Sequence, residues 1–303
     1  MTAPHVRASQ DPKVEAAATE PSRAADYVTL AKPRLNVLVV VTTLAGYYMG
    51  HPANNLVLLL HTLVGTALVA SAASAFNQLL EIDADGRMRR TRRRPLPSRR
   101  LTPGQARVFA VLLSGLGVVQ LAWGVNLLAA GVAFVTLLTY TVFYTPLKRR
   151  TSLATVIGGI PGALPPLIGW AAARGTLSIE AWVLVGIVFL WQMPHFLAIA
   201  WLHREDYAKA GFPLLPVAEP DGASTGRQAV LYAAALVPVS LATTAVGLTG
   251  VVYAVGAGLL GLGFVVLAAR FAWVRTPRSA RGLFFGSLAY LPLVWMLMVV
   301  DRQ

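Results

Sequence analysis

Long apolar stretches, separated by short polar or charged segments, dominate this chain of 303 residues. Most of them approach or exceed the roughly 20 residues that an α-helix needs to cross a bilayer. They predict about nine transmembrane helices, at residues 30–49, 56–80, 104–123, 127–146, 153–173, 179–201, 228–248, 250–273 and 282–300. We therefore expect an all-α, polytopic membrane protein.

Composition agrees with this class, since 56% of the residues are hydrophobic and only 13% are charged. Residues 1–28 differ, because they are polar, rich in alanine and partly acidic, and they lack the apolar core of a signal peptide. We expect them to form a disordered cytoplasmic tail, followed by a single transmembrane domain over residues 29–303. The chain has no cysteine, which excludes disulfides, thiolate metal sites and cysteine nucleophiles.

The basic residues predict the orientation of the helices. Under the nine-span arrangement, 24 of the 26 Lys and Arg residues fall on one side, and only Arg174 and Arg302 fall on the other. The side rich in Lys and Arg faces the cytoplasm, so the N-terminus should be cytoplasmic and the C-terminus outside. This topology explains most of the net charge of +13 without a nucleic-acid partner.

A first polar motif follows the second predicted span directly. Asn77, Glu81 and Asp85 are spaced i, i+4 and i+8, so they share one face if the helix continues through all three. Their oxygens suit a hard divalent cation such as Mg²⁺. The dense arginines that follow, including Arg90 and Arg94, suit a phosphate-rich partner, because guanidinium matches phosphate oxygens in a bidentate fork.

A second polar motif closes the sixth predicted span on the same side. It contains His195, and then His203, Asp206 and Tyr207. The spacing keeps His195, His203 and Asp206 roughly on one face if the helix persists. Polar groups inside apolar spans usually face the protein interior or a wet cavity, which makes His195 a functional candidate.

The end of the fourth span supplies a third patch on this side, with Tyr144, Lys148 and Arg149 beside one another. These residues are candidates for holding phosphate. In the next span, the glycines and prolines of residues 158–166 predict a kink at membrane depth.

Structural explanations compete with each of these functional interpretations. The acids of the first motif would then pair with adjacent arginines at a hydrated helix end, and the arginines would serve as positive-inside anchors. His195 would be a core histidine bonded to a neighbouring span, and His203 an interfacial residue. Tyr144 and Lys148 would be interfacial belt and snorkelling residues.

Several motifs, in order over roughly residues 30–217, resemble the UbiA-type intramembrane prenyltransferases. The first motif resembles that family's first Asp-rich motif, and further features resemble its protoheme IX farnesyltransferase, or heme O synthase, branch. Those features are Lys32-Pro33-Arg34, Asp85-x-x-Met88-x-Arg90-Thr91-x-x-Arg94-Pro95-Leu96, Tyr144-Thr-Pro-Leu-Lys148-Arg-Arg-Thr151, Gly158-Gly159 with Pro165-Pro166 and Gly169-Trp170, Trp191-Gln-Met-Pro-His195-Phe, and Asp206-Tyr207-x-x-Ala210-Gly211-x-Pro213 with Leu215-Pro216.

The resemblance implies about nine helices around a central cavity, with Mg²⁺ and diphosphate at its cytoplasmic mouth. It also implies farnesyl diphosphate as donor, and protoheme IX as substrate rather than cofactor. It implies metal binding by Asn77, Glu81 and Asp85, and diphosphate binding by Arg90, Arg94, Tyr144, Lys148 and Arg149. Where aromatic prenyltransferases carry further aspartates in the second motif, this chain has His195, His203, Glu205 and Asp206, with Tyr207 next to them. Whether His195 ligates heme iron or accepts a proton stays open.

Three other functions remain open: prenyl transfer to a quinone or chlorophyll-type acceptor, secondary transport, and non-catalytic heme delivery. Transport would place buried polar groups at the membrane midplane, whereas the charged clusters here gather at one mouth. The composition favours a bacterial inner membrane. Heme A synthase or an oxidase assembly factor is a candidate partner for the basic face.

Overall fold

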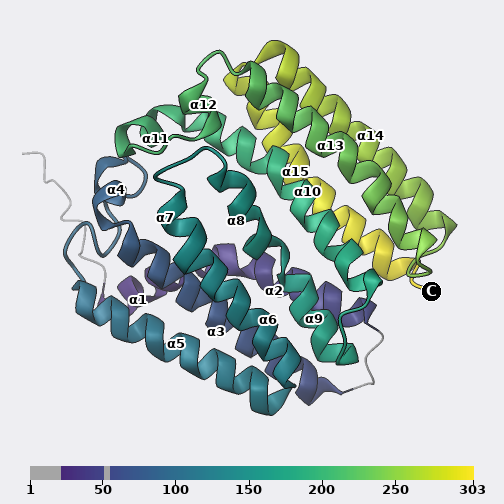
Figure 1. The fold of residues 1–303 in the computed structure, drawn as a ribbon, viewed down its shortest axis with the longest axis horizontal. Coiled ribbons are helices and arrows are strands. Elements are labelled where there is room, and N and C mark those ends of the chain that lie inside the picture. Colours follow the sequence, from purple (N-terminus) through teal and green to yellow (C-terminus); the bar gives the residue numbers. More distant parts are fainter. Residues whose placement is uncertain (1–21, 51–54) are drawn as a thin grey trace, which may run out of the picture.

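The computed structural model describes residues 22–50 and 55–303 (Figure 1). These residues are almost entirely helical, and their only β-type pairing is an isolated bridge between Thr249 and Arg302. The helices are α1 (Arg23–Ala31), α2 (Pro33–Met49), α3 (Leu56–Leu80), α4 (Ile82–Arg87), α5 (Pro103–Gly124), α6 (Leu127–Leu138), the π-helix η1 (Thr139–Tyr144), α7 (Thr145–Leu147), α8 (Ala154–Ala163), α9 (Pro165–Arg174), α10 (Ile179–Leu202), α11 (Arg204–Ala210), α12 (Leu215–Ala218), α13 (Ala223–Ala245), α14 (Val251–Val274) and α15 (Pro277–Val300).

The prediction of about nine spans is confirmed as eight or nine. Within the described ranges, eight helices or continuous helical runs are long and apolar enough to cross a membrane, and the bent pair α1–α2 makes a ninth if it is counted as one span. Apolar side chains at helical spacing remain exposed on the outside of the bundle, as Val255, Leu259, Leu262 and Val266 do on α14. Such a surface is stable only against lipid, because water would not solvate it favourably.

The N-terminal boundary differs from the prediction. Most of the predicted tail, residues 1–28, lies outside the described residues, but its last part forms helix α1 from Arg23 onward. Asp26 of α1 is buried and forms an ion pair of 2.9 Å with Arg100, in the loop before α5. This long-range pair fixes α1 against the bundle, which a local reading of a polar segment does not reveal.

The contacts between the spanning helices form a closed path, and α2 also contacts α9 across it. Along this path α2 contacts α3, α3 contacts α6, α6 contacts α8 and α9, and these contact α10. Helix α10 contacts α15, which returns to α2, while α5, α13 and α14 pack on the outside. The predicted arrangement of helices around a centre is thus confirmed, whereas an open central cavity stays a prediction.

Two breaks inside spans follow from prolines. Lys32, immediately before Pro33, ends α1 in the left-handed conformation, and the two helices differ in direction by 41°. Leu164, before Pro165, separates α8 from α9 within the segment 158–166, where a kink was predicted, although Ala154–Arg174 still forms one candidate span. Proline has no backbone N–H to donate, so the helical hydrogen-bond pattern is interrupted at both positions.

Helices α2 and α9 approach so closely that glycine is required at the contact. A Cβ built at Gly46 would overlap the carbonyl oxygen of Pro166, and one at Gly169 would overlap that of Thr43. The two substitutions would push backbone against backbone, which no side-chain rotation relieves. This contact fixes the first span against the fifth.

We expect Gly169→Ala to lower the free energy of unfolding by about 3 kcal/mol, because overpacking of a tight contact costs this much. Thermal unfolding in detergent, followed by circular dichroism, measures the change. Gly131→Ala is the matched control, since a Cβ at that helical glycine meets no atom within 4 Å. Equal unfolding temperatures for the two variants would contradict the expectation.

Candidate active site

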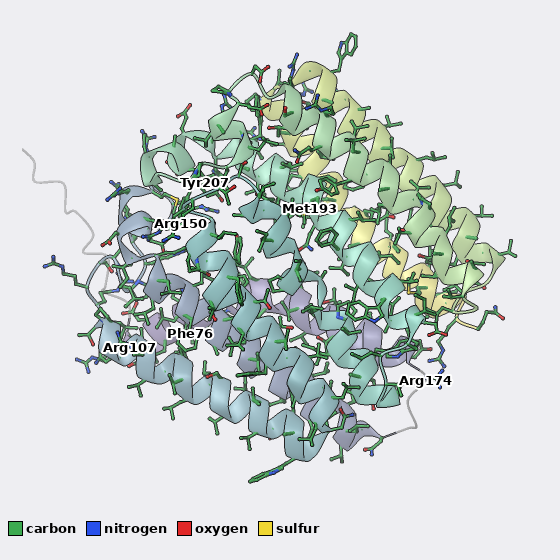
Figure 2. All side chains as sticks on the ribbon, in the orientation of Figure 1. Phe76, Arg107, Arg150, Arg174, Met193 and Tyr207 are labelled. Atoms are coloured by element: carbon green, nitrogen blue, oxygen red, sulfur yellow. The ribbon has the colours of Figure 1, made fainter. Side chains whose placement is uncertain are left out.

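The predicted polar motifs meet at one end of the bundle, which we call the α4–α11 end. Helix α4 packs against α11 there, and Figure 2 places Arg150 and Tyr207 at this end and Arg174 at the opposite one. A small apolar cluster of Ala84, Met88, Ala210 and Phe212 holds the two short helices together. Residues more than 100 positions apart in sequence are thereby brought to one place.

The first motif is buried, but it does not lie on one uninterrupted helix. Helix α3 ends at Leu80, Glu81 has non-helical dihedrals (φ −115°, ψ 15°), and α4 begins at Ile82. The prediction of one continuous helical face is therefore wrong. Asn77, Glu81 and Asp85 are nevertheless only 4%, 3% and 1% exposed, so the acids do not form a hydrated helix end.

Glu81 forms a buried ion pair with Lys148, which follows α7. The Lys148 amine also lies 5.4 Å from the ring centre of Tyr144 and 5.2 Å from that of Phe212. Burial, with smaller contributions from neighbouring cations, lowers the pKa of Lys148 to about 7. An anion beside the amine favours its charged form, and Glu81 lies in that position.

Asp85 is held by the loop that follows α4. Arg94 donates a hydrogen bond of 2.7 Å to Oδ2 of Asp85, and Thr91 donates one of 2.8 Å to the Asp85 carbonyl oxygen. The second carboxylate oxygen, Oδ1, is buried and has no hydrogen-bond partner among the described residues. A buried carboxylate oxygen of this kind is costly unless a ligand completes it.

Asn77 has an orientation set by its neighbours. Thr145 donates its hydroxyl proton to the Tyr140 carbonyl, so its oxygen accepts from Nδ2 of Asn77, at 3.5 Å. Oδ1 of Asn77 then faces Lys32, whose amine lies 3.4 Å away. Lys32 and Thr145 were missed as site residues by sequence reasoning, although the Lys32-Pro33 break was a visible signal.

Arg90 and Arg149, two other predicted phosphate ligands, form hydrogen bonds to neighbouring segments of the chain. Arg90 donates a hydrogen bond of 3.2 Å to the Tyr207 hydroxyl, which joins the loop after α4 to α11. Arg149 donates one of 3.1 Å to the carbonyl oxygen of Leu80, at the end of α3. Tyr144 lies against Gly158, where a Cβ would overlap its ring.

The second motif is split by the fold. Helix α10 ends at Leu202, so His203 (φ −116°, ψ 20°) interrupts the predicted common face with Asp206. His203 is exposed and Asp206 half-buried at the α4–α11 end. Partial burial, followed by the charge of Arg90, lowers the pKa of His203.

His195 lies apart from His203 and Asp206, against helix α15. Its Nδ1 is 2.7 Å from the Ser287 hydroxyl, and its ring stacks between Trp191 and Phe284. Because Ser287 donates its only proton to the Phe284 carbonyl (2.6 Å), Nδ1 must be the donor to Ser287. The neutral imidazole therefore carries its lone pair on Nε2. The structural alternative, bonding to a neighbouring span, is thus correct for Nδ1.

The donor set fits a magnesium ion that shares its ligands with a phosphate. Among the residues that the structure describes, no three His, Asp or Glu side chains converge as a complete metal site. Mg²⁺ usually binds through one or two carboxylates together with substrate phosphates and water. Glu81 and Asp85, with the unsatisfied Oδ1 of Asp85, match that requirement.

Comparison with known proteins agrees with a site for a prenyl diphosphate. Residues 39–291 match the model of the UbiA prenyltransferase family, which is most of the chain. The chain belongs to the UbiA prenyltransferase family. It is therefore a multi-pass membrane prenyltransferase, as the resemblance of its motifs predicted.

Curated relatives place this UbiA prenyltransferase beside one branch of the family. A protoheme IX farnesyltransferase of Solibacter usitatus is 50% identical over 287 residues, which cover 91% of this chain and 98% of the relative. The protein of the same name from Gloeobacter violaceus is 45% identical over 281 residues, which cover 91% of this chain and 91% of the relative. The resemblance to protoheme IX farnesyltransferases is thereby confirmed.

Solved structures confirm the UbiA prenyltransferase fold. A digeranylgeranylglyceryl phosphate synthase matches with a TM-score of 0.77 at 17% identity, covering 92% of this chain and 98% of the other. A UbiA homologue of Archaeoglobus fulgidus bound to GPP and Mg²⁺ matches with a TM-score of 0.66 at 14% identity, covering 90% of this chain and 99% of the other. At these identities the likeness shows the fold alone.

Proposed function

We propose that this UbiA prenyltransferase transfers the farnesyl group of farnesyl diphosphate to a vinyl group of protoheme IX, giving heme O. The observation that carries the proposal is the 50% identity, over nearly the full length of both chains, to a protein named for this activity. The buried acids and cations at the α4–α11 end supply the groups that the reaction requires.

Arg90, Arg94, Lys148 and Arg149 bind the donor's diphosphate in this proposal. Their charges stabilise the negative charge that develops on the leaving group as its bond to the farnesyl carbon breaks. Asn77, Glu81 and Asp85 hold Mg²⁺, which when bound supplies further charge stabilisation at the diphosphate oxygens. A related fold bound to GPP and Mg²⁺ supports this pairing of ligands.

The acceptor reacts through its electron-rich vinyl group. The carbon–oxygen bond of farnesyl diphosphate breaks, its electron pair leaves with diphosphate, and the vinyl carbon forms the new bond to farnesyl. Water then adds to the cation left beside the heme ring and loses one proton, which yields the hydroxyethylfarnesyl substituent. The chain must therefore exclude water until the carbon–carbon bond has formed.

His195 takes the acceptor-side role. Its Nε2 lone pair, left free by the bond between Nδ1 and Ser287, either ligates heme iron or accepts the proton released by water. His203, Asp206 and Tyr207 line the second side of the mouth in place of a second aspartate set, with Tyr207 fixed by Arg90.

The α4–α11 end faces the cytoplasm of a bacterial inner membrane in this proposal, with the C-terminus outside. The basic residues of the loop after α4 and of the segment at 148–150 support that orientation. The exposed basic surface is where heme A synthase or an oxidase assembly factor would bind.

The test is pigment analysis of membranes that contain the protein, supplied with protoheme IX, farnesyl diphosphate and Mg²⁺. Heme O, identified by chromatography and mass, is the expected product, and chelation of Mg²⁺ should abolish it. Membranes without the protein are the control. Prenylation of a quinone precursor without any heme O would refute the proposed acceptor.

A further inference from the structure

Lys32 occupies a chain break that the fold maintains by several contacts. It lies between α1 and α2 with φ 49° and ψ 56°, a conformation that costs energy for any residue with a side chain. Asn36 donates a hydrogen bond of 2.7 Å to the Ala31 carbonyl, which the break leaves free, and another of 3.2 Å to Ser71 on α3. Strain held in this way by its surroundings is characteristic of functional positions.

The break directs the Lys32 side chain into the candidate active site. Its amine donates to Oδ1 of Asn77, at 3.4 Å, and Asn77 is one turn from Glu81. The charges that act on this amine are those of Arg94, Asp85 and Arg90. Lys32 therefore belongs to the same group of charges as the predicted diphosphate ligands, although it enters from a different helix.

Lys32 differs from Lys148 and Arg94, which are half-buried as it is, in having no acidic partner. Lys148 pairs with Glu81 and Arg94 pairs with Asp85, whereas Lys32 forms no ion pair within residues 22–50 and 55–303. The nearby carboxylate, Asp85, is paired with Arg94, a second arginine, Arg90, is also near, and the one polar contact of Lys32 is a long hydrogen bond to a neutral amide. A cation whose nearby acid is already paired is stabilised by binding an anion.

We propose that Lys32 is a further diphosphate-binding residue, which contacts the leaving group of the prenyl donor from the α1–α2 side. This rests on the proposed function for the class of ligand. Together with Lys148 and Arg94, it surrounds the diphosphate from three separate segments of the chain. Lys32 also holds the product, inorganic pyrophosphate, in the same position.

Arg34 provides the matched control. It lies two residues away on α2, is exposed, and makes no hydrogen bond or ion pair with the described residues. A role in positive-inside anchoring would apply to Lys32 and Arg34 alike. A role in diphosphate binding applies only to Lys32.

The experiment measures the Kd of Mg²⁺-pyrophosphate by calorimetry with the full-length protein in detergent. The variants are Lys32→Asn and Arg34→Asn. Asparagine tolerates the left-handed conformation, so Lys32→Asn removes the amine without adding backbone strain. We expect Kd to rise at least about tenfold for Lys32→Asn, since hydrogen bonds to charged groups contribute this much. Arg34→Asn should stay within about twofold.

Lys32→Arg shows whether a loss of pyrophosphate affinity comes from the missing charge or from a disturbed break between α1 and α2. It should retain most of the pyrophosphate affinity and the full dependence of Kd on ionic strength, which Lys32→Asn should reduce. Wild-type affinity in Lys32→Asn would overturn the proposal. An equal loss in Lys32→Arg and Lys32→Asn would also overturn it, because a disturbed break, rather than a missing charge, explains that pattern.

Turnover distinguishes failure of this proposal from failure of the proposed function. If the wild type binds pyrophosphate through Lys32 but makes no heme O, the acceptor assignment fails and the role of Lys32 stands. If the wild type makes heme O and Lys32→Asn leaves the KM for farnesyl diphosphate unchanged, the role of Lys32 fails alone. We expect Lys32→Asn to raise that KM.

Discussion

Replacing Asp85 with asparagine is expected to lower the rate of heme O formation by about a thousandfold. Asp85 is 1% exposed, and its Oδ1 has no partner in the part of the chain described here, so it is free to ligate the metal that stabilises the leaving diphosphate. Loss of one electrostatic contact to developing charge costs catalysis about 10²–10³-fold, and loss of a metal ligand adds to this. Initial rates at saturating farnesyl diphosphate and Mg²⁺ measure the effect.

Asp83→Asn is the control for this prediction. Asp83 lies on the same short helix, α4, but its side chain is exposed and makes no ion pair with the described residues. It should keep most of the wild-type rate. If Asp83→Asn and Asp85→Asn lose activity equally, the effect belongs to helix α4 as a whole, and the metal role of Asp85 is wrong.

Mg²⁺ and pyrophosphate are expected to bind cooperatively, each raising the affinity for the other by about 10–100-fold. Glu81 is paired with Lys148, and Asp85 with Arg94, in this structure. Each candidate metal ligand is therefore bound to a candidate phosphate ligand. Pyrophosphate attracts the two cations and frees the carboxylates for the metal. Neither ligand alone separates these buried ion pairs, because an unpaired buried charge is costly.

The coupling is measured by titrating Mn²⁺, observed by electron paramagnetic resonance, with and without saturating pyrophosphate. Lys148→Met should bind Mn²⁺ more tightly than the wild type in the absence of pyrophosphate, and should show less coupling. Lys209→Met, which removes an exposed cation of α11, is the control. Independent binding of the two ligands to the wild type would contradict the expectation that they separate the two ion pairs together.

Local sequence determined the membrane architecture. Every span requires about 20 apolar residues to satisfy its backbone inside lipid, so hydropathy alone predicted the nine segments and most of their boundaries. The glycines and prolines of residues 158–166 marked the break at Leu164, because the missing N–H of proline interrupts a helix locally. The first acidic motif was also visible, since carboxylates are rare in a chain with only 13 of them.

Spacing within one motif did not determine the site. The helix that carries Asn77 ends before Glu81, and the helix that carries His195 ends before His203, so both predicted common faces were wrong. Apolar contacts between α4 and α11, with Phe212 among them, pack the two helix ends against each other. Those contacts join residues more than 100 positions apart, and no local pattern encodes them.

The sequence by itself thus determined that this chain is a nine-span helical prenyltransferase with an acidic and arginine-rich mouth. Only the tertiary structure decided which charges meet: Glu81 with Lys148, Asp85 with Arg94, and Lys32 with Asn77. It also placed His195 against Ser287 rather than beside His203. The physical reason is that hydropathy acts on each segment separately, whereas a buried charge takes its partner from whichever helix packs against it.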